Sequence, residues 1–307
     1  MEKIVIAFGG NALQRPGEAL TYRAQARNVA EAVESISPVF GKQIGILVTH
    51  GNGTQVGEEF LRNEYAEKRI ETLPFPALVA ETQATIGTML ETAILRKLKR
   101  MRIQRSTSTL LTHVFVSQDD VAFKNPTKPI GPVYSKKKLE AALKLERFRY
   151  VRFDRGYRRV VASPMPEGVA ESQTIKHLVG TGRIVIAGGG GGIPIIDNSG
   201  AYPKASAVID KDLTAQLLGT LIGAQTLVIL TAEDYVYRDY PDRADPIRSI
   251  RVKELKMLIG TFESGTMRPK IRACISFLEH GGGRAFIGNL KKFGSVMEGR
   301  TGTRIIR

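Results

Sequence analysis

Three glycine-rich segments interrupt apolar runs of this sequence, and each has the composition of an anion-binding turn. They are Gly9-Gly10-Asn11, Gly51-Asn52-Gly53 and the five consecutive glycines from Gly188 to Gly192. A helix that begins after such a turn offers unpaired N–H groups and the positive end of its dipole, and glycine lets an anion approach the backbone closely. Any one of these segments is most simply a turn. Together, at one edge of a sheet, they predict a site for several phosphates.

Three lysines at turns or helix starts can supply the positive charge that phosphoryl transfer requires. Lys128 lies between two prolines, Lys211 follows Asp210, and Lys270 follows Pro269. Phosphoryl transfer places negative charge on the equatorial and in-line oxygens, so its catalysis consists mostly of positioning and cationic stabilisation. A single lysine is more often an ordinary surface residue, but the positions of these three predict that they gather at one site.

Other kinds of site find no support in the motifs. The sequence contains neither G-x-x-x-x-G-K-[ST] nor G-x-G-x-x-G, so it has no P-loop and no dinucleotide fingerprint. Its four histidines and one cysteine lack metal-ligand spacing, and there is no G-x-S-x-G nucleophile elbow. We expect His113 and Cys274 to be core residues and His177 and His280 to lie at the surface.

The composition describes a globular chain with a large positive charge. The 307 residues are 42% hydrophobic, enough for one large α/β unit or about two domains without a disulfide. The net charge of +15 is compatible with nucleic acid, an acidic membrane surface or small anions as partners. The basic residues are spread, and their densest cluster, residues 96–105, closes a predicted helix, where cations suit the dipole, so nucleic acid is an unfavoured partner.

Membrane and export features are missing from the pattern. No apolar run approaches the ~18 residues of a membrane span. A lone cysteine and an amino-terminal stretch without an export signal favour residence in the cytoplasm.

Strands that alternate with helices must position the candidate residues. We expect strands at residues 3–8, 43–49, 110–116, 183–187, 226–231 and 284–288. We expect helices at about 21–36, 54–68, 77–99, 174–179, 212–221 and 268–280. This order predicts a mainly parallel sheet covered on both faces, with ligands at the carboxyl ends of its strands.

Residues 117–159 have a different texture, with three closely spaced prolines followed by a short basic helix pattern. We expect an inserted flap that moves on substrate binding, because long insertions over active sites commonly act as lids.

Over essentially its full length the sequence resembles carbamate kinases, within the amino acid kinase superfamily. The segments that carry the resemblance are GGNAL (9–13), THGNG (49–53), QVG (55–57), Asp120 with Ala122-Phe123, PTKPIGP (126–132), RRVV (158–161), Ser163-Pro164, residues 184–194 and AVIDKDL (207–213). The resemblance implies a three-layer α/β/α sandwich with an inserted lid, and usually a homodimer. It assigns residues 1–200, with the lid at about 117–159, to the acid substrate and residues 201–307 to the nucleotide.

The resemblance also implies a reversible reaction in which ATP and carbamate give ADP and carbamoyl phosphate, a reaction of arginine metabolism. Mg²⁺ would come with the nucleotide phosphates. Carried over, the catalytic residues are Lys128, Asp210, Lys211 and Lys270, with Lys128 coming from the flap and Asp210 orienting the lysines. The acid-binding residues are Gly9, Gly10, Asn11, Gly51, Asn52 and Gly53. The nucleotide-binding residues are Gly188, Gly189, Gly190, Lys211, Thr231, Asp234 and Lys270. A carbamate oxygen is already anionic and needs no general base, which agrees with the lack of a suitable histidine.

The sequence departs from the family pattern in several segments. TAEDYVY (231–237) stands where the family has TDVDGVY, which leaves nucleotide preference open, and GTMRPK (265–270) replaces GSMGPK. Thr54 takes the place of a proline, and Thr82-Gln83-Ala84 that of Ser-Gln-Gly. Two alternatives therefore stay open: a kinase for another small carboxylate, phosphate or phosphonate, and a catalytically weak nucleotide- or nucleic-acid-binding protein.

Overall fold

An eight-stranded sheet forms the centre of the protein. The computed structural model describes residues 1–15, 17–136, 149–153, 156–196, 201–203, 205–240, 242–262 and 266–307. The strand order is β14-β16-β15-β11-β1-β2-β9-β3, and every neighbouring pair is parallel except β15 and β16. Their bounds are β1 Lys3–Phe8, β2 Gly45–His50, β3 Thr107–Thr109, β9 Ile184–Ile186, β11 Thr226–Thr231, β14 Ser249–Arg251, β15 Arg284–Asn289 and β16 Thr303–Ile306. The prediction of a mainly parallel sheet is confirmed.

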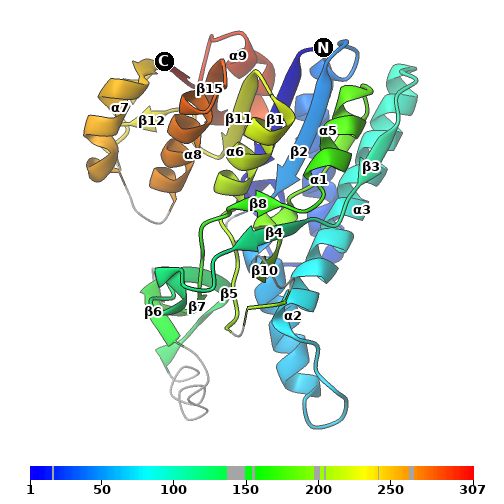
Figure 1. Ribbon diagram of the computed structural model, residues 1–307, viewed down its shortest axis with the longest axis vertical. Helices are drawn as coiled ribbons and strands as arrows, with labels where there is room; N and C mark the ends of the chain where they lie inside the picture. The colour runs from blue at the N-terminus through cyan, green and yellow to red at the C-terminus, as the bar shows by residue number, and fades with distance from the viewer. Residues whose placement is uncertain are drawn as a thin grey trace.

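Helices cover both faces of this sheet (Figure 1). Their bounds are α1 Tyr22–Ile36, α2 Gly53–Ala66, α3 Phe75–Met101, α5 Ser172–Gly180, α6 Lys211–Ile222, α7 Val252–Leu258, α8 Met267–Glu279 and α9 Phe293–Met297. Successive strand side chains point to opposite faces, so Val5 and Ala7 pack with α5, α6 and α8, whereas Ile4 and Ile6 pack with α1, α3 and α9. Two buried cores thus flank one sheet, which makes the predicted three-layer sandwich.

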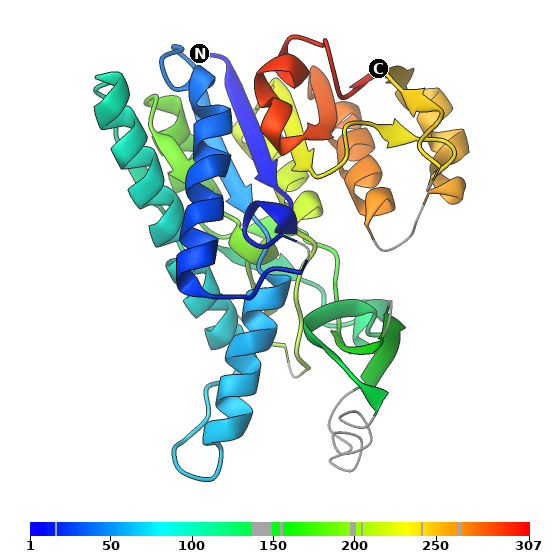
Figure 2. The same ribbon diagram turned by 180° about the vertical axis from the view of Figure 1, so that it is seen from behind.

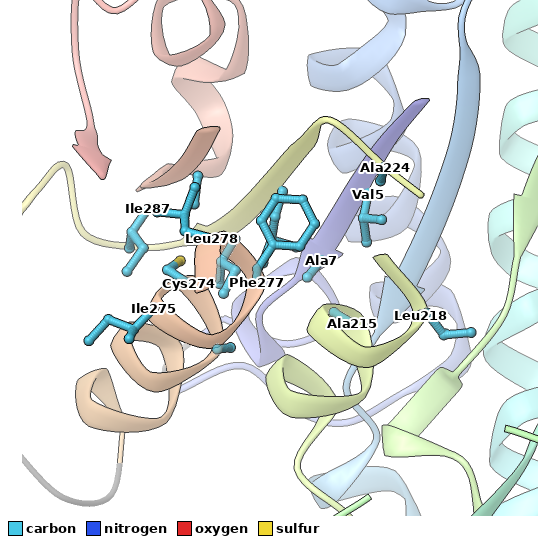
Figure 3. Packing of buried hydrophobic residues seen from close by; sticks show 14 of the residues in the cluster. Val5, Ala7, Ala215, Leu218, Ala224, Cys274, Ile275, Phe277, Leu278 and Ile287 are labelled. Carbon is cyan, nitrogen blue, oxygen red and sulfur yellow. The ribbon is translucent and has the colours of Figure 1, made fainter. Parts of the chain in front are cut away.

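The core on the α6–α8 face shows how closely these layers pack. Figure 3 shows Phe277 and Leu278 of α8 near Val5 and Ala7 of β1. A Cβ built on Gly219 of α6 would lie 2.9 Å from the Phe277 ring, so a glycine is needed where the two helices meet. This contact holds α6 and α8 side by side near their carboxyl ends, and the first turns of the same two helices carry two of the three candidate lysines.

The strand expected at residues 110–116 is wrong in extent. Residues 107–109 form β3 at the edge of the main sheet, while β4 (His113–Val116) pairs with β10 (Ile193–Ile196) and β8 (Gly168–Val169) in a separate sheet. Gln83 causes the break, since its side chain accepts from the N–H of Thr112 at 2.9 Å and donates to its carbonyl at 3.2 Å. A continuous apolar run concealed this turn because its partner lies on a distant helix.

A small antiparallel sheet projects beside α2 below the carboxyl ends of the main strands (Figure 1). Its strands are β5 Lys128–Tyr134, β6 Arg149–Phe153 and β7 Gly156–Val161, in the order β5-β7-β6. A Cβ on Gly57 of α2 would lie 2.0 Å from the Gly131 backbone, so this sheet rests directly on α2. It occupies much of the expected flap, and the short basic helix expected after the prolines lies outside the described residues.

Three of the four histidine and cysteine placements are confirmed. Cys274 is fully buried, and His177 and His280 are exposed. His113 is not a core residue: its side chain is 37% exposed and its Nδ1 lies 2.8 Å from Oε1 of Glu171. Alternate residues of β4 face the interior, and His113 is in the outward set. No helix among the described residues is long and apolar enough to cross a membrane.

Candidate active site

One cavity of about 220 Å³ brings all three predicted lysines together with residues from each glycine segment. It lies at the carboxyl ends of β1 and β2, which lead into the first two glycine segments. These strands run from the end marked N in Figure 2 toward the small sheet. The predicted residues that line it are Gly10, Gly51, Asn52, Gly53, Lys128, Gly190, Asp210, Lys211 and Lys270.

The three lysines are held by two carboxylates. Lys128 Nζ donates to Asp210 Oδ2 at 2.5 Å. Lys211 Nζ donates to Asp212 Oδ1 at 2.5 Å, and Lys270 Nζ donates to Asp212 Oδ2 at 3.2 Å. Asp212 therefore holds two ammonium groups from different helices on its two oxygens. We had expected Asp210 to orient the lysines; its only hydrogen-bonded lysine among the described residues is Lys128.

The local backbone around α6 explains why these carboxylates stay in place. Asp210 is the N-cap of α6, and its Oδ1 accepts from the N–H of Asp212 at 2.9 Å. One carboxylate thus caps the helix with one oxygen and binds Lys128 with the other. The cap also starts α6 at Lys211, which places Lys211 and Asp212 in its first turn beside the cavity.

Burial and the neighbouring charges shift the pKa values of the groups in this cluster. Burial lowers the pKa of Lys211, and Asp212 offsets only part of that effect. Burial alone would raise the pKa of Asp212, but Lys211 and Lys270 outweigh it and hold that pKa below its usual range. For Lys270 burial is likewise outweighed, and Asp212 with Asp210 raises its pKa. The cluster is therefore a charged one in which the two lysines depend on Asp212.

The glycine run does not reach the cavity as a whole. Gly190 lines it at φ +64°, and a Cβ there would lie 2.2 Å from the Asn52 amide. Gly188 and Gly189 instead pack against Leu218 and His50, and neither lines a described cavity. Of the three glycines predicted to bind the nucleotide, all within the described residues, only Gly190 lines this cavity.

The first turn of α2 forms another wall. Asn52 is 2% exposed and donates from Nδ2 to Thr82 Oγ1 at 2.8 Å, which fixes the turn that carries Gly53 and Thr54. The N–H groups of this first helical turn face the cavity end of the helix. Asn11 follows Gly10 in the first glycine segment, but its side chain lies outside the described part of the chain.

A larger cavity of about 630 Å³ adjoins the first and shares Gly10, Thr266 and Lys270 with it. Gly9 and Thr231, both predicted for the site, line it. Tyrosines, Phe262 and Met267 give it an apolar side suited to a base and sugar. Asp234 does not line it, since its carboxylate accepts from Asn289 Nδ2 at 2.9 Å and Lys292 Nζ at 2.7 Å.

The lining residues that the sequence reasoning left without a role include Arg158, Asp212 and Thr266. Asp212 and Arg158 stood inside matching segments, AVIDKDL and RRVV, without a role. Burial lowers the pKa of Arg158, which lines the cavity from β7. The spacing D-K-D was the usable signal for Asp212, since residues 210 and 212 flank Lys211 at a helix start.

The sheet, the cationic cavity and the adjoining larger cavity define an α/β phosphotransferase. The family model of the amino acid kinase family matches residues 2–289. The chain is 39% identical to a carbamate kinase of Pyrococcus horikoshii and 40% identical to one of Staphylococcus haemolyticus, in each case over 99% of both chains. The chain therefore belongs to the amino acid kinase family and, within it, to the carbamate kinases.

Solved structures agree with this assignment. The carbamate kinase of Giardia lamblia bound to citric acid superposes with a TM-score of 0.93 at 32% identity, over 99% of this chain and 98% of that one. The same enzyme bound to AMP-PNP gives a TM-score of 0.89 at 32% identity, over the same shares of the two chains. The expected sandwich fold is thus confirmed.

Proposed function

We propose that this enzyme transfers a phosphoryl group reversibly between ATP and carbamate, giving ADP and carbamoyl phosphate. The observation that carries the proposal is the convergence of Lys128, Lys211 and Lys270 on one small cavity beside a larger one. The membership of full-length relatives in the carbamate kinases supports the choice of acceptor.

In this proposal the smaller cavity holds the carbamate and the phosphoryl group in transfer. Lys270 borders both cavities, so its ammonium group stabilises charge on the oxygen that bridges them. Lys211 stabilises the equatorial oxygens, and Lys128, with Arg158 beside it, binds the acid. Gly10 and the first turn of α2 add backbone N–H donors.

No general base is required, because the attacking carbamate oxygen is already anionic. Among the four histidines, His50 lies nearest in sequence to the residues of the smaller cavity, since it directly precedes Gly51. His50 is buried, and burial lowers its pKa to about 4. It therefore stays neutral at physiological pH and supports the turn rather than the chemistry.

Mg²⁺ would reach the site on the nucleotide phosphates. In the described residues no group of three His, Cys, Asp or Glu side chains is arranged to hold a metal ion. The two carboxylates of the cavity are already paired with lysines. When bound, the ion neutralises phosphate charge, while the protein's own contribution is the three ammonium groups.

The proposal also assigns the two substrate sites to different parts of the chain. Residues 1–200 would carry the acid site, with a lid at about 117–159, and residues 201–307 the nucleotide site. We also propose a homodimer in the cytoplasm that serves arginine metabolism. Size measurement by light scattering tests the dimer directly.

A coupled assay tests the reaction. The enzyme is incubated with ADP, Mg²⁺ and carbamoyl phosphate, and ATP is measured with hexokinase and glucose-6-phosphate dehydrogenase. We expect ATP formation that depends on both substrates. If no ATP forms at high enzyme concentration, the proposed reaction is wrong.

One observation keeps a second acceptor in view. Thr54 lines the smaller cavity at the start of α2 and adds a hydroxyl and an N–H there. Such donors also suit another small carboxylate, phosphate or phosphonate. A panel of these acids, each assayed for ADP release from ATP, separates the two readings, since only turnover above that with carbamate supports the alternative acceptor.

A further inference from the structure

A third cavity, of about 490 Å³, lies at the opposite end of the sheet. Three connecting segments line it, each leading into the amino end of a parallel strand. They are residues 40–44 before β2, residues 103–106 before β3 and residues 177–183 before β9. The end marked N in Figure 2 lies on this side of the molecule. Its volume is in the range of small-molecule sites, and its position separates it from the candidate active site.

Arg105 ties the three segments together. Its Nε donates to the carbonyl of Gly182 at 2.5 Å, and its Nη1 donates to those of Phe40 at 3.2 Å and Lys42 at 3.4 Å. Its Nη2 donates to the carbonyl of Ile44. The guanidinium group is thus half-buried among backbone carbonyls, which fix its position but do not cancel its charge. Burial lowers the pKa of Arg105. The usual pKa of a guanidinium group is so high that the side chain nevertheless stays charged.

The charged side chains around Arg105 are cationic. Lys42 and Arg183 also line the cavity, together with His177, and no Asp or Glu does among the described residues. Neither Lys42 nor Arg183 forms an ion pair with a carboxylate of the described residues. Several positive charges therefore border one concave space, and no carboxylate of the residues that the structure describes pairs with Lys42 or Arg183 there.

The ends of two helices are partly capped by the backbone and need no side chain of the cavity for those bonds. Two helices, α3 and α5, end at the cavity, and a basic residue often pairs with such an end. Several carbonyls there already accept backbone hydrogen bonds: Arg102 N–H donates to Lys99, Ile103 N–H to Leu98 and Thr181 N–H to His177. The ammonium group of Lys42 and the guanidinium group of Arg183 are thus available to a ligand in the cavity.

We propose that this cavity binds a small phosphate-bearing anion, at a site separate from the active site. Lys42 and Arg183 would contact the phosphate oxygens, and Gln43, Gln104 and Ser106 supply neutral polar groups around them. A charge-assisted contact from a guanidinium group to a phosphate is among the stronger hydrogen bonds in proteins. The site gives a function to part of the +15 charge that phosphoryl transfer leaves unused.

Hydrogen–deuterium exchange of the full chain with inorganic pyrophosphate as the probe tests the site. Pyrophosphate is also expected at the active site, so the readout is local: slower amide exchange in residues 40–44, 103–106 and 177–183. We expect this protection in the wild type and in Lys128→Ala, since Lys128 lies at the other end of the sheet. Protection confined to the active-site segments would overturn the proposal.

The double variant Lys42→Gln/Arg183→Gln supplies the matched test. Both side chains are exposed, so the fold should survive, and Arg105 is left intact. We expect roughly tenfold weaker pyrophosphate binding at the three segments. The control is Lys253→Gln/Arg272→Gln, which removes the same charge from exposed positions of α7 and α8. Equal weakening in both double variants would mean a general charge effect and no site.

A nucleic acid is the alternative ligand that the cationic cavity could bind. Single-stranded RNA is added to the pyrophosphate complex at several salt concentrations. We expect it to leave the protection of the three segments in place. Displacement with a steep salt dependence would show a polymer-binding surface and overturn the small-anion proposal.

Discussion

Lys211 and Lys270 bind opposite oxygens of one buried carboxylate, that of Asp212, at 2.5 and 3.2 Å. The two lysines come from α6 and α8, 59 positions apart in the chain, and their side chains are only 10% and 15% exposed. Two ammonium groups this close repel one another unless an anion lies between them. Asp212 supplies that anion in this structure, and in the proposed mechanism phosphate oxygens would add to it.

Removing Lys211 tests its place in the mechanism. We expect Lys211→Ala to lower kcat by ~10²-fold or more, because a buried ammonium group that stabilises transition-state charge is lost. Steady-state kinetics in the ATP-forming direction measure it. Turnover at the wild-type rate would remove Lys211 from the reaction.

Asp212→Asn tests the shared carboxylate through pH rather than through rate alone. In the wild type Asp212 raises the pKa of Lys270 and limits the fall for Lys211, so the variant should lose the lysine protons at lower pH. The alkaline limb of the pH–rate profile should therefore move to lower pH. Asp242→Asn, at an exposed position, is the control for the loss of one charge. A lower kcat with an unmoved limb would show that Asp212 acts only on the fold.

His50 makes stability depend on pH. Its pKa is lowered from 6.5 to about 4 by burial, so between these values the unfolded chain binds a proton that the folded chain does not. Stability is then lost as the pH falls from about 6.5 to 4, by about 3 kcal/mol at most. Urea unfolding at several pH values should show a shallower loss for His50→Gln than for the wild type. The exposed His177→Gln should follow the wild type, and an identical loss in all three proteins would contradict the prediction.

Gly57→Ala tests the support of Lys128 by α2. The new Cβ would lie 2.0 Å from the Gly131 backbone, so β5 must move, and Lys128 moves with it. We expect a loss of about 1–3 kcal/mol in the free energy of unfolding and a higher KM for carbamoyl phosphate. Gly180→Ala, where the added Cβ meets nothing within 4 Å, should leave both unchanged or stabilise slightly. Equal effects of the two substitutions would argue against the contact.

The small sheet is expected to move together with α2 when substrate binds. Arg159 of β7 donates to Glu64 Oε1 at 2.8 Å and lies 4.5 Å from the Phe60 ring centroid, so β7 is fastened to that helix. Hydrogen exchange with and without carbamoyl phosphate should change in residues 128–134, 156–161 and 53–66 together. A change in the sheet alone would mean that the contact of Arg159 with Glu64 and Phe60 breaks. Unchanged exchange and unchanged protease sensitivity would argue against any motion.

Much of the sandwich could be predicted from the sequence, because its signals are local. Apolar strands followed by glycine turns and amphipathic helices are each contained within about 30 residues. Apart from the strand expected at 110–116, these elements are close to where they were expected, whereas β14, α7, α9 and β16 were not expected. The division at residues 110–112 was not predictable in this way, since Gln83 creates it from α3. His113 was misplaced for the same reason: its strand belongs to a second sheet with another inward face.

The site shows the same limit. The three lysines could be predicted to meet because each stands at the start of an element, Lys128 in β5, Lys211 in α6 and Lys270 in the first turn of α8, but their partners could not be assigned from residue type. Asp210 and Asp212 are two positions apart, and only the direction of the first helical turn decides which carboxylate faces which lysine. Asp234 was assigned to the nucleotide site by its motif, yet its carboxylate accepts a hydrogen bond from Lys292, 58 positions further along the chain.

The border that Gly10, Thr266 and Lys270 make between the two neighbouring cavities has a kinetic consequence. Donor and acceptor seated on its two sides would face each other directly, with the Lys270 ammonium group at the boundary. Direct transfer across this border would require both substrates to be bound before either product leaves.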